Sequence, residues 1–253
     1  MHLHEEQLNQ NGCPMKIVEY IDNRNIVIEF QDVYKARVKT SYGNFKRGVV
    51  RNPYCPTVYG VGISGNKYPI VKNDRPAKEY DTWRSILGRC FNEDIKKKQP
   101  TYINVTCCEE WLNYERFYEW LHSQENFEKW YSNKRWAVDK DIFVKKNKIY
   151  CPEMCCLVPQ NVNCLFLKRE AERGLYPIGV SYRNDGFLAS CHNPFTNDRE
   201  ELGYYSTPEK AFGIYKDYKE DLIKQVAQIE YKNGNITKDC YEAMMSYEVE
   251  IDD

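Results

Sequence analysis

The spacing of apolar and polar residues at the start of the chain predicts a small β module. Residues 15–21 and 26–30 each alternate as half-buried strands do, and the Asp22-Asn23-Arg24-Asn25 stretch between them is typical of a hairpin turn. A third strand is expected at residues 36–40. Glycine and proline are dense from 53 to 76, which indicates turns that close the module and lead into a linker.

From Lys78 onward the apolar residues recur with the period of a helix rather than that of a strand. One helix is expected from this point, and a second from about residue 108. Their apolar faces consist of Tyr80, Trp83, Ile86, Leu87 and Cys90 in the first, and of Trp111, Tyr114, Phe117, Tyr118 and Leu121 in the second. We interpret these aromatic stripes as core rather than as platforms for stacking bases.

After Trp136 the pattern changes to short segments of alternating type. A strand is expected at 136–143, a turn at 145–148, a second strand over 149–158, and a helix from Pro159 to about Arg169. This order of strand, loop, strand and helix is the outline of a ββα-metal unit.

The last third of the chain predicts a small sheet followed by a long helix. Three short strands are expected within 176–205, separated by turns at 184–186 and 193–198. Thr207-Pro208-Glu209 starts a helix, because it combines an N-cap, a proline at the first helical position and an acid in the first turn. This helix is expected to pass Lys224 and to end before Gly234, ahead of a short terminal helix.

Composition restricts the class of protein. Lys and Arg total 36 against 37 Asp and Glu, a formal net charge of -1. No stretch approaches the roughly 18 consecutive apolar residues of a spanning helix, and the first residues lack the pattern of a secretory signal. We therefore expect a cytoplasmic protein without a membrane partner. Its 11 cysteines are expected to be reduced, and their spacing does not favour zinc.

Positive charge is concentrated in short stretches. Residues 35–51 include six basic residues and no acid, and residues 145–148 and 168–169 form two further clusters. Segregated positive charge attracts phosphate, although a solvated face is the alternative for each cluster. The candidate nucleic-acid contacts are Lys35, Arg37, Lys39, Lys46 and Arg47 in the first stretch, and Lys145 and Lys146 in the second. Acidic residues gather at 109–128 and 248–253.

Separated motifs over about 90 residues resemble a known family. They are Tyr80-Asp-Thr-Trp83, Arg89-Cys90-Phe91, Cys108-Glu-Glu-Trp111, Phe117-Tyr-Glu-Trp120, Val138-Asp-Lys-Asp141, Asn147, Tyr150-Cys-Pro-Glu153 and Val158-Pro-Gln-Asn-Val-Asn163. The set resembles the phage and prophage proteins identified as HNH endonucleases. The resemblance implies a ββα-metal domain over residues 78–170.

A second resemblance covers the expected sheet and helix. It is carried by Gly179-Val180, Arg183, Gly186-Phe187, Ala189, Leu202-Gly203-Tyr204-Tyr205, Thr207, Glu209, Ala211 and Tyr215. These residues resemble the DNA-binding domain of plant ethylene-response factors, which reads the major groove with Arg and Trp side chains on a three-stranded sheet. The aligned contact positions are Ser181, Arg183, His192, Arg199 and Glu201. Of these, Arg183 and Arg199 keep the chemistry for guanine or phosphate.

The resemblance to HNH nucleases also implies a catalytic centre. Such enzymes activate a water with a His on the first strand and hold a divalent cation with acidic, Asn or His ligands. Lys140 is aligned with that His, and Met154 with an Asn ahead of the second strand. Two neighbouring carboxylates keep a lysine protonated, and a thioether does not hold a hard cation, so the centre is expected to be broken. The candidate catalytic residues are Asp139, Lys140 and Asn163, with Asn161 as the other helix position, and the candidate ligands for Mg²⁺ or Mn²⁺ are Asp139, Asp141 and Asn163.

The sequence thus predicts an α+β protein of four parts. They are an N-terminal β module at 1–72, an HNH-like domain at 78–170, a sheet-plus-helix module at 174–225, and a C-terminal helix with an acidic tail at 226–253. The expected function is DNA binding by a phage-type protein derived from an HNH homing-type endonuclease, with weak or no cleavage, in the host bacterial cell. Two alternatives stay open: an active metal-dependent endonuclease, and a protein-binding phage factor that inhibits a host defence system.

Overall fold

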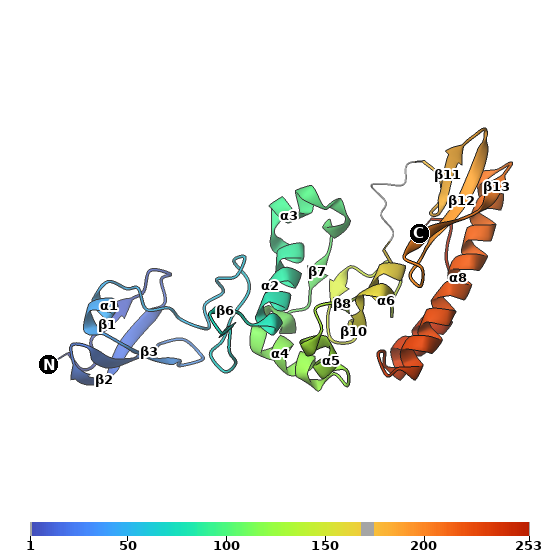
Figure 1. Ribbon diagram of the computed structural model, residues 1–253. Coiled ribbons are helices and arrows are strands. Elements are labelled where there is room, and N and C mark those ends of the chain that lie inside the picture. Colours follow the sequence, from blue (N-terminus) through green and yellow to red (C-terminus); the bar gives the residue numbers. More distant parts are fainter. Residues whose placement is uncertain (1, 168–174, 253) are drawn as a thin grey trace. The chain divides into compact units, whose positions relative to one another are not determined.

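The computed structural model describes residues 2–167 and 175–252 and belongs to the α+β class (Figure 1). The predicted fold class is therefore confirmed. The chain divides into two compact units, which are described separately. Unit 1 contains Met1–Asn92 and Glu109–Glu119, and unit 2 contains Glu93–Cys108 and Trp120–Asp253. The four predicted domain ranges stay a prediction.

Unit 1 begins with an antiparallel sheet of four strands in sequential order. They are β1 (Glu6–Leu8), β2 (Pro14–Asp22), β3 (Asn25–Phe30) and β4 (Arg37–Thr40). Alternate residues point into one core, which includes Met15, Ile17, Ile26, Ile28 and Phe30. Phe45 closes this core from the short helix α1 (Tyr42–Lys46), whose N-cap is Ser41. The alternation in the sequence thus predicts the side of the sheet that is buried.

The hairpin between β2 and β3 forms where the polar stretch predicts it. Asp22 Oδ1 accepts hydrogen bonds from the backbone N–H groups of Arg24 and Asn25, at 2.7 and 2.9 Å. Before β1, His4 N donates to the carbonyl of Ile17 at 2.9 Å, which ties the start of the chain to β2.

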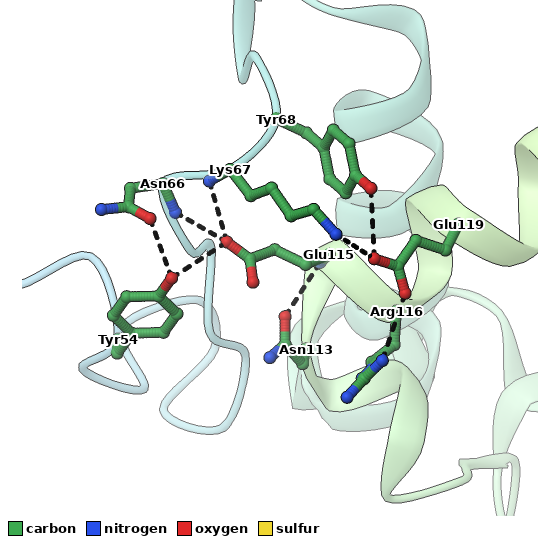
Figure 2. A network of polar contacts seen from close by, with 8 residues as sticks. All are labelled: Tyr54, Asn66, Lys67, Tyr68, Asn113, Glu115, Arg116 and Glu119. Atoms are coloured by element: carbon green, nitrogen blue, oxygen red, sulfur yellow. Dashed lines mark hydrogen bonds and ion pairs between the residues drawn. The ribbon is translucent and has the colours of Figure 1, made fainter. Parts of the chain in front are cut away.

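The segment after the sheet is held to the start of helix α4 (Tyr114–Ser123) by two carboxylates of that helix (Figure 2). Glu115 Oε1 accepts hydrogen bonds from the backbone N–H groups of Asn66 and Lys67, both at 2.9 Å. Glu119 Oε1 lies 2.6 Å from Lys67 Nζ. Gly65 makes this approach possible: it has φ +68°, and a Cβ there would lie 2.2 Å from Glu115 Oε1. The stretch rich in glycine and proline is thus bound to helix α4 within unit 1.

The aromatic stripes of the two predicted helices form core, as expected. The first predicted helix is α2 (Lys78–Phe91), and Trp83 within it donates from Nε1 to the carbonyl of Trp111 at 2.7 Å. The second begins later than predicted, because residues around Trp111 form the 3₁₀ turn η2 (Glu110–Leu112) before α4 starts. The remaining elements between the sheet and residue 132 are short: β5 (Val71–Lys72), β6 (Arg75–Pro76), α3 (Glu93–Lys98), η1 (Pro100–Tyr102), β7 (Thr106–Cys107) and α5 (Phe127–Ser132).

Unit 2 contains the predicted strand, loop, strand and helix, with one change in pairing. Strand β8 (Trp136–Asp139) pairs antiparallel with β10 (Cys156–Pro159), and helix α6 (Gln160–Leu165) follows directly. The stretch expected as one strand over 149–158 is divided: β9 (Ile149–Tyr150) pairs in parallel with β7 instead. Helix α6 ends at Leu165, before the predicted end near Arg169, a residue that lies outside the described part of the chain.

The C-terminal part of unit 2 is the predicted three-stranded antiparallel sheet followed by a helix. Its strands are β11 (Val180–Arg183), β12 (Gly186–Asn193) and β13 (Asp198–Tyr205), and its helices are α8 (Pro208–Lys232) and α9 (Lys238–Met245). Thr207 Oγ1 accepts from Lys210 N at 3.3 Å, which confirms the predicted N-cap. Gly179 has φ +77°, and a Cβ there would lie 2.1 Å from the Tyr215 ring, so only glycine lets this chain segment approach α8 so closely.

Candidate nucleic-acid interface

The β8–β10–α6 segment places Asp139 at the end of its first strand, which stops four residues before the predicted end at 143. Asp139 is opposite Cys156 in the last pair of the β8–β10 ladder. Its side chain is buried, and Oδ1 accepts hydrogen bonds from the backbone N–H groups of Asp141 (2.7 Å) and Ile142 (3.0 Å). Burial, with the nearby charge of Asp141, raises the pKa of Asp139 to about 6. The carboxylate thus closes the turn that follows its own strand.

Lys140 holds the same loop together from the inside. Its side chain is buried, and Nζ donates to Asp141 Oδ1 at 2.6 Å and to the carbonyl of Asn147 at 2.8 Å. Asn147 returns the contact, since its Nδ2 donates to the carbonyls of Lys140 (2.8 Å) and Ile149 (2.9 Å). Both partners of the ammonium are acceptors, which is the arrangement of a charged lysine with a structural role. A side chain bound in this way does not take a proton from water.

The candidate metal ligands do not form a ready set around one point. Asp139 Oδ1 accepts hydrogen bonds from the backbone N–H groups of Asp141 and Ile142, and Asp141 Oδ1 is bound by Lys140. Asn161 donates to Glu230 Oε1 at 2.7 Å, while Asn163 lies half-buried on α6. Within residues 2–167 and 175–252, no three His, Cys, Asp or Glu side chains are arranged to hold a metal ion. These residues do not fit a Mg²⁺ or Mn²⁺ site as they stand, and metal binding stays a prediction.

The N-terminal basic residues do not all lie on one strand face. Lys35 precedes β4 and has a left-handed backbone conformation (φ +50°). Only Arg37 and Lys39 therefore share the exposed face of the strand. The strand begins at Arg37, one residue later than the predicted range of 36–40, and Lys35 lies outside it. Arg37 is bound by Glu29 at 2.9 Å, and Lys46 by Glu5 at 2.7 Å.

Arg47 in the same stretch donates to Asn44 Oδ1, at 2.6 Å, rather than to a carboxylate. Lys35 donates to Gln31 Oε1 at 3.1 Å. Lys39 is exposed and forms no ion pair with the described residues. Two of the five N-terminal candidates are thus neutralised within unit 1.

The second basic cluster is covered by the acidic end of the same chain. Lys146 Nζ lies 2.6 Å from Asp252 Oδ2, and Lys145 Nζ lies 3.2 Å from Glu250 Oε1. Lys145 also donates to the carbonyl of Glu248 at 2.7 Å. These contacts place the carboxylates where phosphate oxygens would have to bind. The predicted nucleic-acid contacts of this loop are therefore taken up by the chain's own acidic residues.

The acidic segment reaches this loop because its apolar residues anchor it. Val249 is buried, its carbonyl accepts from Lys216 Nζ, and its N–H donates to Glu220 Oε1, both at 2.7 Å. Apolar residues alternate with acids along 247–252; Val249 is bound to α8, and Glu250 and Asp252 pair with the lysines. The alternation is visible in the sequence, and it was missed because acids at a chain end are usually solvated.

The outer face of the C-terminal sheet holds two arginines that are not neutralised. Glu200 accepts a hydrogen bond from Tyr218 of α8, so its side chain lies on the face of the sheet that packs against this helix. Adjacent residues of a strand point to opposite faces, and Arg199 therefore points outward. Arg199 Nε donates to Ser190 Oγ at 2.9 Å, and no carboxylate among the described residues binds its guanidinium. Arg183 is exposed at the end of β11, and its guanidinium has no hydrogen-bond partner among the described residues.

The other aligned positions on this face differ in character. Ser181, His192 and Glu201 alternate with the inward residues of their strands, and Glu201 is paired opposite Ser190 in the ladder. Tyr204 adds a half-exposed ring to the face. The result is a surface with two cations, one acid and an aromatic ring.

Comparisons with known proteins do not identify a family for this chain. No protein-family model, curated protein or solved structure matches the chain. No helix in the described part of the chain combines the length and apolar character needed to cross a membrane.

Proposed function

We propose that the protein binds DNA through the outer face of the β11–β13 sheet, and that its β8–β10–α6 segment is a non-cleaving scaffold derived from a phage-type HNH nuclease. The binding proposal rests on the way in which Ser190 holds the side chain of Arg199. Its Nε is fixed by Ser190, so the terminal nitrogens of its guanidinium are presented in a set orientation. A guanidinium presented in this way suits bidentate contact with a phosphate or with guanine O6 and N7.

The proposal for the scaffold rests on Lys140. The residue aligned with the catalytic His is buried and bound to Asp141 and Asn147, so it supplies neither a general base nor a metal ligand. Asp139 beside it is engaged by two backbone N–H groups. Asp139 and Lys140, two of the three candidate catalytic residues, are thus engaged in stabilising the loop.

Fluorescence anisotropy with a labelled DNA duplex tests the binding proposal. The Arg183→Ala/Arg199→Ala double variant should bind more weakly, and the slope of log K against log salt should fall by up to about 2, because each lost phosphate contact removes about one counterion. Lys232→Ala with Lys238→Ala is the matched control: both residues are exposed, on α8 and α9, and the charge change is the same. Equal losses in both double variants would refute a specific role for the sheet.

A second candidate function is binding to a protein. It is favoured by the ion pairs that neutralise Arg37, Lys46, Lys145 and Lys146, which leave a surface of mixed charge. Wild-type anisotropy separates the two candidates, since a protein-binding factor should show no salt-dependent affinity for duplex DNA in the micromolar range or tighter.

A further inference from the structure

Cys13 and Cys55 bring two thiols together in unit 1, although they lie far apart in the sequence. The thiol of Cys55 is hydrogen-bonded to that of Cys13, and burial together with this hydrogen bond raises the pKa of Cys55. Both side chains are only partly buried, so small reagents in the solvent can reach them. The pair lies apart from the proposed DNA-binding face, which belongs to unit 2.

Two buried asparagines hold the cysteine-bearing segments side by side. Asn9 Oδ1 accepts a hydrogen bond from Cys13 N at 2.8 Å, and Asn9 Nδ2 donates to the carbonyl of Val50 at 3.0 Å. The carbonyl of Asn52 accepts from Cys55 N at 3.3 Å. These contacts fix the approach of the two segments without any help from the thiols. Thiols that already touch in this way can be joined with little movement of the backbone.

A second pair of touching thiols, in unit 2, differs in its exposure. The thiol of Cys156 is hydrogen-bonded to that of Cys240, but the two residues are only 3% and 1% exposed. Exchange with a disulfide in solution requires access to the attacking thiolate. Burial should therefore keep this second pair reduced under conditions in which Cys13 and Cys55 react.

We propose that Cys13 and Cys55 form a site of reversible oxidation, at which a small disulfide such as oxidised glutathione joins the two thiols within the folded unit 1. One protein thiolate attacks a sulfur of oxidised glutathione, which forms a mixed disulfide and releases the first glutathione. The other protein thiol loses its proton and attacks the protein sulfur of the mixed disulfide, which releases the second glutathione. The protein loses two electrons and two protons, and oxidised glutathione takes them up. This site does not rest on the proposed function.

Peptide mapping of the full chain after incubation with oxidised glutathione tests the proposal. The remaining thiols are alkylated, and the protein is digested with trypsin without reduction. The peptides 1–16 and 52–67, each with one cysteine, should then appear joined, and dithiothreitol should separate them. Cys55→Ser should abolish the joined peptides and leave Cys13 bound to glutathione. Cys164→Ser, which removes an exposed thiol of unit 2, is the matched control and should leave them unchanged.

Urea unfolding shows whether the bond forms in the native fold. A disulfide between these positions restricts the unfolded chain, so oxidised wild type should unfold at a higher urea concentration than reduced wild type. Cys55→Ser should show no such shift.

Three results would overturn the proposal. The first is glutathione attached to Cys13 and Cys55 without joined peptides, or no reaction at either residue. The second is joined peptides with an unchanged or lowered urea midpoint, because the bond would then not belong to the native fold. The third is a disulfide between Cys156 and Cys240 that forms as fast, because exposure would then not select the pair.

Discussion

Lys140 and Asn147 hold each other across the loop that follows β8. The ammonium of Lys140 donates to the carbonyl of Asn147, and the amide of Asn147 donates to the carbonyl of Lys140, both at 2.8 Å. If the segment derives from an HNH nuclease, as proposed, the position of Lys140 would carry a catalytic His. Here the position contributes to the stability of the loop.

Stability measurements should therefore reveal a coupled pair. Asn147→Ala leaves two buried carbonyls and one N–H without their partner, and we expect it to lower the free energy of unfolding by about 2 kcal/mol or more. Lys140→Met should cost less in the Asn147→Ala background than in the wild type, with a coupling energy of about 0.5–3 kcal/mol in a double-mutant cycle. Urea unfolding measures both, with the exposed Asn233→Ala as control. Strict additivity would show that the two side chains act separately.

The raised pKa of Asp139 should appear in the pH dependence of stability. The folded protein holds this proton more tightly than the unfolded chain, whose aspartate pKa is near 3.9. Its contribution to stability is therefore complete below about pH 4 and is lost as the pH rises through about 6.

Asp139→Asn keeps an oxygen for both backbone N–H groups and removes the titration. Relative to this variant, the wild type should lose about 2–3 kcal/mol of unfolding free energy between pH 4 and pH 7.5. Urea unfolding at a series of pH values measures the difference. Asp185→Asn, at an exposed turn, serves as control. A constant difference between wild type and Asp139→Asn across this range would contradict the assignment.

The contact between Gly65 and Glu115 predicts a difference between two glycine substitutions. Gly65→Ala and Gly12→Ala both place a Cβ on a residue with positive φ, but only at Gly65 does the Cβ meet another group, Glu115 Oε1 at 2.2 Å. Gly12→Ala should cost about 1 kcal/mol from backbone strain. Gly65→Ala should cost about 1–3 kcal/mol more, because it also displaces the carboxylate. Equal melting temperatures for the two variants would refute the contact.

Release of the acidic segment should strengthen DNA binding, if the proposed function is correct. Glu250→Gln/Asp252→Asn removes the ion pairs of Lys145 with Glu250 and of Lys146 with Asp252, so affinity at low salt should rise several-fold and the salt slope should steepen by up to about 2. Asp239→Asn/Glu242→Gln makes the same change in net charge on α9. If this control raises the affinity equally, the effect comes from net charge rather than from uncovering the loop.

The parts of the fold that depend on local spacing could be predicted from the sequence. The β2–β3 hairpin, α2, the three C-terminal strands and the Thr207 cap each depend on residues close together in the chain. The division of residues 149–158 into two strands could not be predicted, because β9 pairs with β7, more than forty positions earlier.

The candidate site was predictable in position but not in its interactions. The sequence places Asp139 in the first strand of this segment, and the structure agrees, although the strand ends there rather than at 143. Nothing local indicates that Lys140 turns inward to Asn147, or that Asp252 reaches Lys146 over more than one hundred residues.

The most direct test of the account is a plasmid assay with the wild-type protein. Supercoiled DNA is incubated with the protein in Mg²⁺ and, separately, in Mn²⁺, and is run on gels both before and after removal of the protein. We expect retarded migration while the protein is bound and intact supercoiled DNA after its removal. Nicked or linear DNA that disappears with Asp139→Asn would contradict the non-cleaving scaffold, and unretarded DNA at micromolar protein and low salt would contradict the DNA-binding proposal.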